Sequence, residues 1–487
     1  MSNAVSESDS GDSDAVRSTP AAIAAQLVYD DQGILASDES VPTIGKRLEK
    51  AGLVNDERTR QAYRDIFYGV GVPGVPRYKG PRKSGPAGWR PPREPNGIGG
   101  VGISGAILFK EALDQRCVTG KRKGMPFVDS LRRQHVLVGV KVDSGLEPLQ
   151  APGALPLETQ TRGLAELPEL VREVAAKGAE FAKFRCALRM APGSSGGAST
   201  GPSEAAIDVN ARQLAEYAAI CQAGGGDLQG SALCPIVEPE LLIDGAHNAA
   251  AFEAASARVM SSTIAALWRQ PGVSLEGLLI KPQMVVPGSE WKPPPGTSAG
   301  LGLGGLPIAP DEVAERTLRV MRATVPPAVP GIMFLSGGQT ERQATQNLAY
   351  LNQLAGNHAS NSSSSSKPLG PWALSFSFGR ALQASVLKCW VDNGGGKRVD
   401  VKEEHEDKRV KKEEEDGGGG VTGVAAGEDD MSSDERAELA AQKARVVAMA
   451  LADANRQAVR GWPLEGDHPS LFKPEEGGLH ETYRGHY

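Results

Sequence analysis

Eight short apolar runs, rich in β-branched residues, recur at wide spacing along the chain. They lie at 32–37, 101–109, 135–142, 181–186, 234–240, 275–281, 331–337 and 372–378. Helical periodicity marks several of the intervening segments, at 166–178, 203–222, 252–270 and 311–325. Alternating strands and helices are typical of a parallel sheet, because parallel neighbours need a crossover element. Eight such units predict an α/β protein with a closed (β/α)8 TIM barrel, and an open doubly wound sheet is the alternative that the pattern leaves.

Stretches rich in Gly, Pro and Ser interrupt the barrel expected over 21–390, and we expect them to be surface insertions. They lie at 73–97, 191–203, 222–231, 291–305 and 355–367. We expect disorder over 1–20 and over 391–431. A last helix of the barrel domain is predicted at 432–461, where Ser432 and Glu435 have capping-box spacing. The C-terminal tail, 462–487, shows no periodicity.

Composition excludes several classes of protein. Fifty-three basic residues against 59 acidic ones give a net charge of -6, which does not indicate nucleic-acid binding. No apolar run is long enough to span a membrane. The five cysteines form no CxxC pair and fit a reducing compartment, and the seven histidines show no metal-ligand spacing. The first twenty residues lack an apolar core, so we expect a soluble cytoplasmic protein without a targeting segment.

Polar groups stand at the carboxyl ends of all eight apolar runs. In chain order they are Asp38 and Glu39, Lys110 and Glu111, Lys141 and Asp143, Lys183 and Arg185, Glu238 and Glu240, Lys281, Ser336 with Gly337 and Gly338, and Ser377 with Gly379 and Arg380. In a barrel these ends converge on the face that holds active sites. Any single strand can end in a polar residue simply because it reaches water. That explanation is weaker for Lys141, Lys183, Glu238 and Lys281, which stand within or directly after β-branched residues.

Lys281 ends the run LEGLLIKP, and on this stretch alone a solvated or ion-paired lysine is the commoner explanation. Among other cations, however, a buried lysine loses its proton more easily, and its free amine can attack a ketone to form a Schiff base. Glu238 and Asp38 are candidates to move the protons. Glycine-rich turns follow the last two strands, and Arg380 adds a guanidinium, so we expect a phosphorylated carbonyl substrate.

Several motifs also occur in a recognisable order: GILASDES with IGKRL, GVKVD, FAKFRC, PIVEPE, LEGLLIKP, FLSGGQ and LSFSFGRALQ. Together they resemble the class I, metal-independent fructose-1,6-bisphosphate aldolases, from about residue 20 to 390 and again in the last helix and tail. The resemblance implies reversible cleavage of fructose 1,6-bisphosphate to dihydroxyacetone phosphate and glyceraldehyde 3-phosphate. It also implies no metal or other cofactor, a sugar-phosphate substrate and a homotetramer.

The resemblance assigns roles to particular residues. Lys281 would form the Schiff base, Glu238 would be its acid/base with Lys183 in support, Asp38 would take the C4 hydroxyl proton, and Tyr487 would exchange a proton with the enamine. Substrate-binding positions would be Ser336, Gly337, Gly338, Ser377, Gly379 and Arg380 at one phosphate, Lys141, Ser40 and Arg47 toward the other, with Arg185 and Glu240 supporting. Two positions depart from the family pattern, Phe378 for tyrosine and Thr43 for serine. The insertions leave the oligomeric state open.

A second hypothesis is an aldolase-like barrel that acts as a non-catalytic binding or scaffold protein, with the insertions as its working surface. Its support is the segment 397–412, whose two basic clusters faintly resemble a bipartite nuclear signal. Interleaved acidic residues favour a solvated, disordered linker there. Because a scaffold has no need of Asp38, Lys183, Glu238 and Lys281, their presence favours the enzyme.

Overall fold

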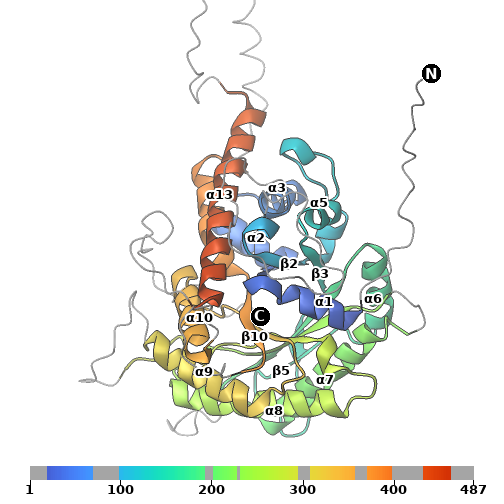
Figure 1. Ribbon diagram of the computed structural model, residues 1–487, viewed down its shortest axis with the longest axis vertical. Helices are drawn as coiled ribbons and strands as arrows, with labels where there is room; N and C mark the ends of the chain where they lie inside the picture. Colours follow the sequence, from blue (N-terminus) through green and yellow to red (C-terminus); the bar gives the residue numbers. More distant parts are fainter. Residues whose placement is uncertain are drawn as a thin grey trace, which may run out of the picture.

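The computed structural model describes residues 19–69, 98–191, 201–226, 231–293, 308–356, 370–396 and 431–461. Within these residues, eight parallel strands close into a barrel in the order β1-β10-β9-β8-β7-β6-β3-β2 (Figure 1). The strands are β1 (Gly33–Ser37), β2 (Ile103–Leu108), β3 (Leu137–Lys141), β6 (Phe181–Leu188), β7 (Cys234–Leu241), β8 (Leu279–Ile280), β9 (Gly331–Phe334) and β10 (Ala373–Phe378). The predicted (β/α)8 barrel is confirmed, and the open doubly wound sheet is excluded.

All eight predicted strands are present, and their bounds differ most from the prediction in the sixth run. The run 275–281 contributes only the two-residue β8, because Leu275–Gly277 form a turn of 3-10 helix instead. The structure also adds a hairpin that the sequence analysis did not predict, formed by β4 (Leu146–Pro148) and β5 (Thr159–Thr161).

Each predicted helix is confirmed, within a few residues at its ends: α6 (Leu167–Ala176), α7 (Glu204–Gln222), α8 (Ala249–Arg269), α9 (Pro310–Thr324) and α13 (Ser433–Val459). The capping box of α13 is also present, since Ser432 accepts from the Glu435 N–H and Glu435 accepts from the Ser432 N–H. Helices that the sequence analysis did not predict are α1 (Pro20–Leu27), α2 (Val41–Lys50), α3 (Glu57–Tyr68), α4 (Ile98–Val101), α5 (Phe127–Arg133), α10 (Glu341–Ala355) and α11 (Ala384–Asp392).

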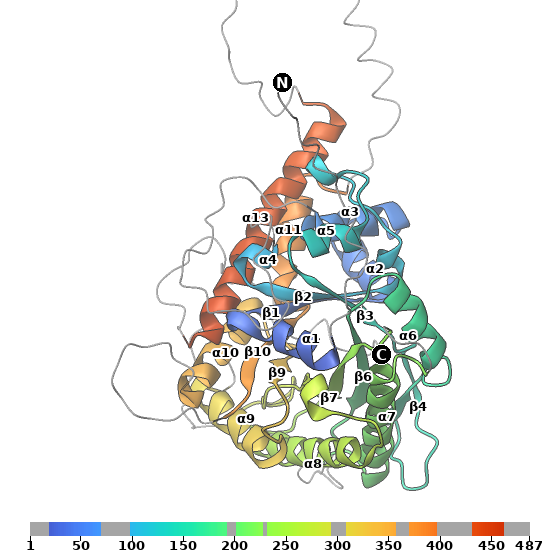
Figure 2. The ribbon, with the colours of Figure 1, turned by 45° about the vertical axis from the view of Figure 1, so that its right-hand side comes forward.

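Helix α1 covers the amino-terminal end of the barrel (Figure 2). Its residues Ile23, Ala24 and Leu27 pack in one buried cluster with Phe181 at the start of β6 and Met333 of β9, which point into the barrel. The cluster fills this end with apolar side chains. Polar chemistry is therefore left to the opposite end, where the strands finish.

Helix α13 runs along one side of the molecule and packs on α3, α10 and α11 (Figure 1). A buried ion pair joins α13 to α3, with 2.8 Å between Arg445 Nη2 and Asp65 Oδ2. Among the described residues, no helix is both long enough and apolar enough to cross a membrane. The predicted segments 1–20, 73–97, 191–203, 291–305, 355–367, 391–431 and 462–487 lie wholly or largely outside the described residues, and of 222–231 only 227–230 lies outside them.

Candidate active site

Alternation along the strands brings the predicted catalytic side chains to the inside of the barrel. Ile34, Phe181, Ile236 and Leu279 all belong to the buried cluster in the barrel interior. Residues an even number of positions further along a strand face the same side. This period places Asp38, Lys183, Glu238 and Lys281 at the inner mouth of the barrel, above the apolar interior.

Lys281 lies against Glu238, with 2.8 Å between Lys281 Nζ and Glu238 Oε1, and both side chains are buried. The pairing of β7 with β8 produces this contact, because Val237 is level with Ile280 and the Lys281 N–H donates to the Val237 carbonyl at 2.8 Å. Lys281 therefore does not extend its amine to open water, as a surface lysine at a strand end would do.

Lys183 lies at the centre of the charged groups. Its Nζ is 2.7 Å from Asp38 Oδ2, 3.9 Å from Asp143 Oδ2 and 3.2 Å from Glu238 Oε2. The contact with Glu238 has an ion-pair distance without hydrogen-bond geometry. Lys183 thus joins β1 to β7 across the barrel mouth and links Asp38 to the Lys281–Glu238 pair.

Two further groups complete the cluster. Lys141 Nζ lies 2.8 Å from Asp143 Oδ1, and Lys141 is level with Lys183 in the pairing of β3 with β6. Asp143 Oδ2 is buried and has no hydrogen-bond partner among the described residues. The charged cluster, as we call it below, has six members: Lys141, Lys183, Lys281, Asp38, Asp143 and Glu238. Its three amines match its three carboxylates in formal charge.

The ionisation of the cluster follows from burial and from these neighbours. Burial alone would raise the pKa of Asp38, but Lys183 and Lys281 outweigh burial and lower it to about 2. Burial likewise opposes the charged form of Glu238, and the same two lysines lower its pKa. For Lys183, burial would lower the pKa, and Asp38, Glu238 and Asp143 raise it instead. Lys183 is therefore held as an ammonium, and Asp38 and Glu238 as carboxylates.

The sequence analysis noted Asp143 only as one more polar group at a strand end and gave it no role. Its position two residues beyond Lys141, the last residue of β3, was the available signal. It gave no indication that the carboxylate would lie between Lys141 and Lys183. Lys110 and Glu111 also follow a predicted strand, but they lie outside the charged cluster. Lys110 pairs with Glu173 at the surface and Glu111 pairs with Arg60, so neither joins the cluster.

A second polar group surrounds Arg47 on α2. Arg47 forms an ion pair with Glu39, and its Nη1 donates to Gln383 Oε1 at 3.2 Å. The hydroxyl of Tyr63 donates to the same oxygen at 3.2 Å. Gln383 in turn donates to the Ala36 carbonyl of β1 at 2.7 Å, which fixes Arg47 relative to the strand that precedes Asp38. Gln383 was not among the predicted site residues.

The remaining predicted residues lie at neighbouring strand ends. Arg185 and Glu240 form an ion pair between β6 and β7. Ser40 occupies the N-cap position of α2 without a capping hydrogen bond from its side chain, and its hydroxyl lies 3.0 Å from that of Thr43. Ser336 to Gly338 follow β9. Gly379 and Arg380 follow β10, which pairs with β9 on the side away from β8. Ser377 Oγ is buried without a hydrogen-bond partner among the described residues. Tyr487 lies outside the described residues.

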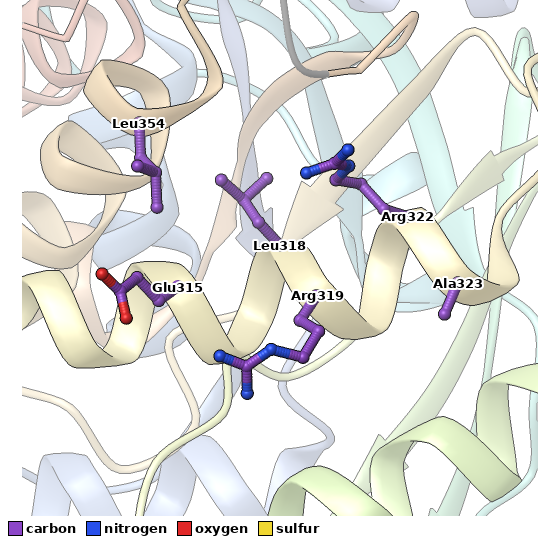
Figure 3. A pocket seen from close by; sticks show the side chains of 6 residues that line it. All are labelled: Glu315, Leu318, Arg319, Arg322, Ala323 and Leu354. Atoms are coloured by element: carbon purple, nitrogen blue, oxygen red, sulfur yellow. The ribbon is translucent and has the colours of Figure 1, made fainter.

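Two surface cavities lie away from this site. A surface cavity of about 470 Å³ lies on the outer face of α9 near the end of α10, and is lined by Glu315, Leu318, Arg319, Arg322, Ala323 and Leu354 (Figure 3). A second cavity of about 230 Å³ lies beside the β4-β5 hairpin. Neither lining contains a member of the charged cluster. The site is identified instead by its buried charges, each of which lies against a charge of opposite sign. Burying a charge is costly unless it is paired in this way.

The fold and the charged cluster together define a (β/α)8-barrel enzyme with a lysine-centred site at the strand ends. Comparison with known proteins makes the class specific. The profile of the family described as "Fructose-bisphosphate aldolase class-I" matches residues 20–72 and 98–438. The chain belongs to this family.

Relatives and a solved structure agree with this assignment. The chain is 40% identical over 383 residues to "Fructose-bisphosphate aldolase 6, cytosolic" of Arabidopsis thaliana, covering 79% of this chain and 85% of the relative. It is 40% identical over 379 residues to "Fructose-bisphosphate aldolase, cytoplasmic isozyme 2" of Pisum sativum, covering 78% and 84%. A ternary co-crystal structure of fructose-bisphosphate aldolase from Plasmodium falciparum, in complex with TRAP and a small molecule inhibitor, is similar with a TM-score of 0.65. It is 33% identical and covers 92% of this chain and 95% of that one.

Proposed function

We propose that the chain catalyses the reversible cleavage of fructose 1,6-bisphosphate to dihydroxyacetone phosphate and glyceraldehyde 3-phosphate through a Schiff base on Lys281. The observation that carries this proposal is the unbroken series of contacts from Lys281 through Glu238 and Lys183 to Asp38. It provides one amine in contact with a carboxylate and a second carboxylate fixed across the barrel mouth. The names of the relatives support an aldolase and give no support to the non-catalytic scaffold.

In the first step Glu238 takes a proton from the Lys281 ammonium, the free amine attacks the C2 carbonyl of the ketose to form a carbon–nitrogen bond, and Glu238 returns the proton to the C2 oxygen. The resulting carbinolamine loses its hydroxyl as water and becomes an iminium. Glu238, 2.8 Å from the amine, is placed to take the amine proton and to return a proton to the leaving hydroxyl. Lys183 favours the carboxylate form of Glu238, which is the form that can accept that proton.

In the second step Asp38 takes the proton of the C4 hydroxyl. The C3–C4 bond breaks, its electron pair moves to the iminium to give an enamine, and glyceraldehyde 3-phosphate leaves as the aldehyde. With a pKa of about 2, Asp38 is a weak base in the unliganded protein. The anionic phosphates of the substrate oppose the field of the neighbouring lysines, and so raise the pKa of Asp38 when the substrate is bound.

In the third step the enamine gains a proton at C3, a role we propose for Tyr487, and hydrolysis of the iminium releases dihydroxyacetone phosphate. The substrate phosphates are proposed to bind at Ser336, Gly337, Gly338, Gly379 and Arg380 at one end, with Ser377 beside them. Lys141, Ser40 and Arg47 are proposed for the other end, with Arg185 and Glu240 in support. Glycine-rich backbone and guanidinium groups are suitable donors to phosphate oxygens.

Borohydride trapping tests the proposal. The protein is incubated with dihydroxyacetone phosphate and reduced, so that an iminium becomes a stable secondary amine, and the modified peptide is identified by mass spectrometry. We expect one adduct, on Lys281, and none in K281M. Lys183 is the internal control, because its raised pKa keeps it protonated and therefore not nucleophilic. A folded protein without an adduct, or with the adduct on Lys183, would overturn the assignment.

We propose further that the reaction needs no metal or other cofactor, in line with the class I family. Activity that persists in EDTA is the expected result, and strong inhibition would contradict it. The protein is proposed to act in the cytoplasm, supported by relatives named as cytosolic or cytoplasmic isozymes. Assembly as a homotetramer is proposed from the family resemblance, and sedimentation equilibrium of the full chain measures it.

A further inference from the structure

Gln283 lies two residues after Lys281 and is buried at the same barrel mouth. The even spacing from Leu279 and Lys281 places it on the inner face of the barrel. The backbone around it continues the pairing of β8 with β9 beyond the strand ends. Gln283 forms an isolated parallel bridge with Leu335, and the Leu335 N–H donates to the Pro282 carbonyl at 3.0 Å. The turn after β9 therefore begins directly beside Gln283.

The side chain of Gln283 holds this turn. Its Nε2 donates to the Gly337 carbonyl at 2.9 Å. The opposite assignment of the amide would place two acceptor oxygens against each other, so the contact requires the nitrogen at this position. The other amide atom, Oε1, is buried and has no hydrogen-bond partner among the described residues. The bond to Gly337 is thus the polar contact that Gln283 makes in the described part of the chain.

Gly337 and Gly338 have φ angles of +24° and +77°, in a region that favours glycine. The turn is closed by the Gln339 N–H, which donates to the Ser336 carbonyl at 2.8 Å. A Cβ atom on Gly337 would lie only 1.9 Å from Gln283 Oε1, so the turn lies flush against the glutamine side chain. Two adjacent glycines allow the peptide between them to take either of two orientations, since neither residue restricts the sign of φ.

The bond from Gln283 selects one of these orientations. In a planar trans peptide the carbonyl and the next N–H point in opposite directions. A Gly337 carbonyl that points at Gln283 therefore directs the Gly338 N–H away from Gln283. If the peptide rotated, the carbonyl oxygen would take the place of that N–H and would repel an anion.

We propose that Gln283 is a positioning residue that sets the peptide between Gly337 and Gly338 for binding of a substrate phosphate, and so couples the phosphate loop to the strand end that carries Lys281. This inference rests on the proposed function of Ser336 to Gly338 as phosphate ligands. Gln283 acts through the turn and need not touch the substrate. Its effect should therefore appear in recognition of the phosphate, and not in the chemistry of the amine.

The test compares two ketones in the borohydride assay: dihydroxyacetone phosphate, and dihydroxyacetone, which has no phosphate. Q283M keeps the length of the side chain and removes the donor. We expect it to raise the half-saturation concentration for dihydroxyacetone phosphate about tenfold, the range of one lost hydrogen bond, and to leave that for dihydroxyacetone unchanged. Q283E, which sets a carboxylate against the Gly337 carbonyl, should raise the half-saturation concentration for dihydroxyacetone phosphate at least as much.

Gln222 provides a matched control. Its amide also bonds to backbone, donating to the Ser274 carbonyl and accepting from the Ser274 N–H, both at 2.8 Å. These contacts lie beside the segment that leads into β8, away from the strand ends. Q222M should leave the ratio of the two half-saturation concentrations unchanged.

A ratio in Q283M and Q283E equal to that of the unmodified protein would overturn the proposal, whatever the change in melting temperature. If the unmodified protein forms no adduct with either ketone, the proposed function fails instead. Calorimetric titration with inorganic phosphate then still tests whether Gln283 supports phosphate binding by the turn at Ser336 to Gly338. Weaker phosphate binding in Q283M than in Q222M supports the positioning role, and equal binding refutes it.

Discussion

Replacing Lys183 by methionine should destabilise the protein strongly, and in a way that depends on pH. Lys183 is the amine that faces three carboxylates, Asp38, Glu238 and Asp143. The pKa of Asp38, lowered from 3.8 to about 2, measures part of this interaction. A shift of that size corresponds to about 2 kcal/mol of stability at neutral pH.

Other terms add to the cost of K183M. The substitution removes the cation and leaves three buried carboxylates facing Lys281 and Lys141 alone. Removing one partner of a buried ion pair costs about 3–5 kcal/mol, because the other charge stays buried without compensation. We expect K183M to lose that amount of unfolding free energy at pH 7. As a control, K177M removes a partly exposed lysine that pairs at the surface with Asp114 and Glu173, and should cost less than about 1 kcal/mol.

The pH dependence has a definite sign. In the unmodified protein the contribution of Asp38 is present above pH 3.8 and is lost as the pH falls toward 2. Without Lys183, burial should raise the pKa of Asp38 above its ordinary value, and the penalty then disappears when the carboxyl is protonated. The difference in unfolding free energy between K183M and the unmodified protein should therefore narrow from pH 7 to pH 4.

Urea unfolding followed by tryptophan fluorescence at the two pH values measures this difference. The double variant K183M/D38N removes one of the uncompensated charges and should recover about 1–2 kcal/mol at pH 7. A loss below about 1 kcal/mol at pH 7, or a difference that does not change with pH, would refute the view that Lys183 compensates buried carboxylates.

Three further predictions concern other buried or capping groups. R445M should cost about 3–5 kcal/mol by leaving Asp65 buried without its cation, and D65N in the same chain should recover part of the melting temperature; no recovery would contradict the pairing. Burial lowers the pKa of His247 from 6.5 to about 4, so this neutral group costs stability as the pH falls through that interval. H247N should therefore reduce the loss of unfolding free energy between pH 6.5 and pH 4 by up to about 3 kcal/mol. An unchanged dependence of the unfolding free energy on pH would refute this role of His247. S432A removes the cap of α13 and should lower the unfolding free energy by about 1 kcal/mol, whereas K443A, within the same helix, is the comparison variant.

The barrel strands could be predicted because their residues are buried on both faces, so each strand is visible in the sequence as a run of apolar residues. Helices with polar buried faces could not be predicted in the same way. In α10, Gln343, Asn347 and Asn352 are buried on the same helix as Ala344, Leu348 and Leu351, so polar residues interrupt the apolar stripe that identifies a helix. In α3, Arg64 and Asp65 are buried through ion pairs with residues far along the chain. Tertiary partners, which no local pattern records, satisfy these groups.

The candidate site could be predicted in part for a related reason. Position within or directly after an apolar run indicated Lys281, Glu238 and Lys183, but the same kind of position is occupied by Lys110, which turns outward to Glu173. What separates these cases is the direction of the side chain and the register between strands. Gln283 was overlooked because a polar residue after a proline is ordinary in sequence. Its bond to the Gly337 carbonyl depends on how β8 and β9 lie side by side.

The balance of charge in the cluster bears on why an amine suits this position. In the proposed mechanism, an iminium on Lys281 keeps the positive charge that Glu238 faces in the unliganded protein, so the covalent step need not leave a buried carboxylate without compensation. The Lys183 ammonium stays in place, since its raised pKa prevents it from losing a proton to the reaction. The anionic substrate then changes the field mainly through its phosphates. Asp38, which the lysines hold as a weak base, is the carboxylate whose basicity this change increases. In the proposed mechanism, binding of the substrate thus raises the basicity of Asp38 at the stage where the carbon–carbon bond must break.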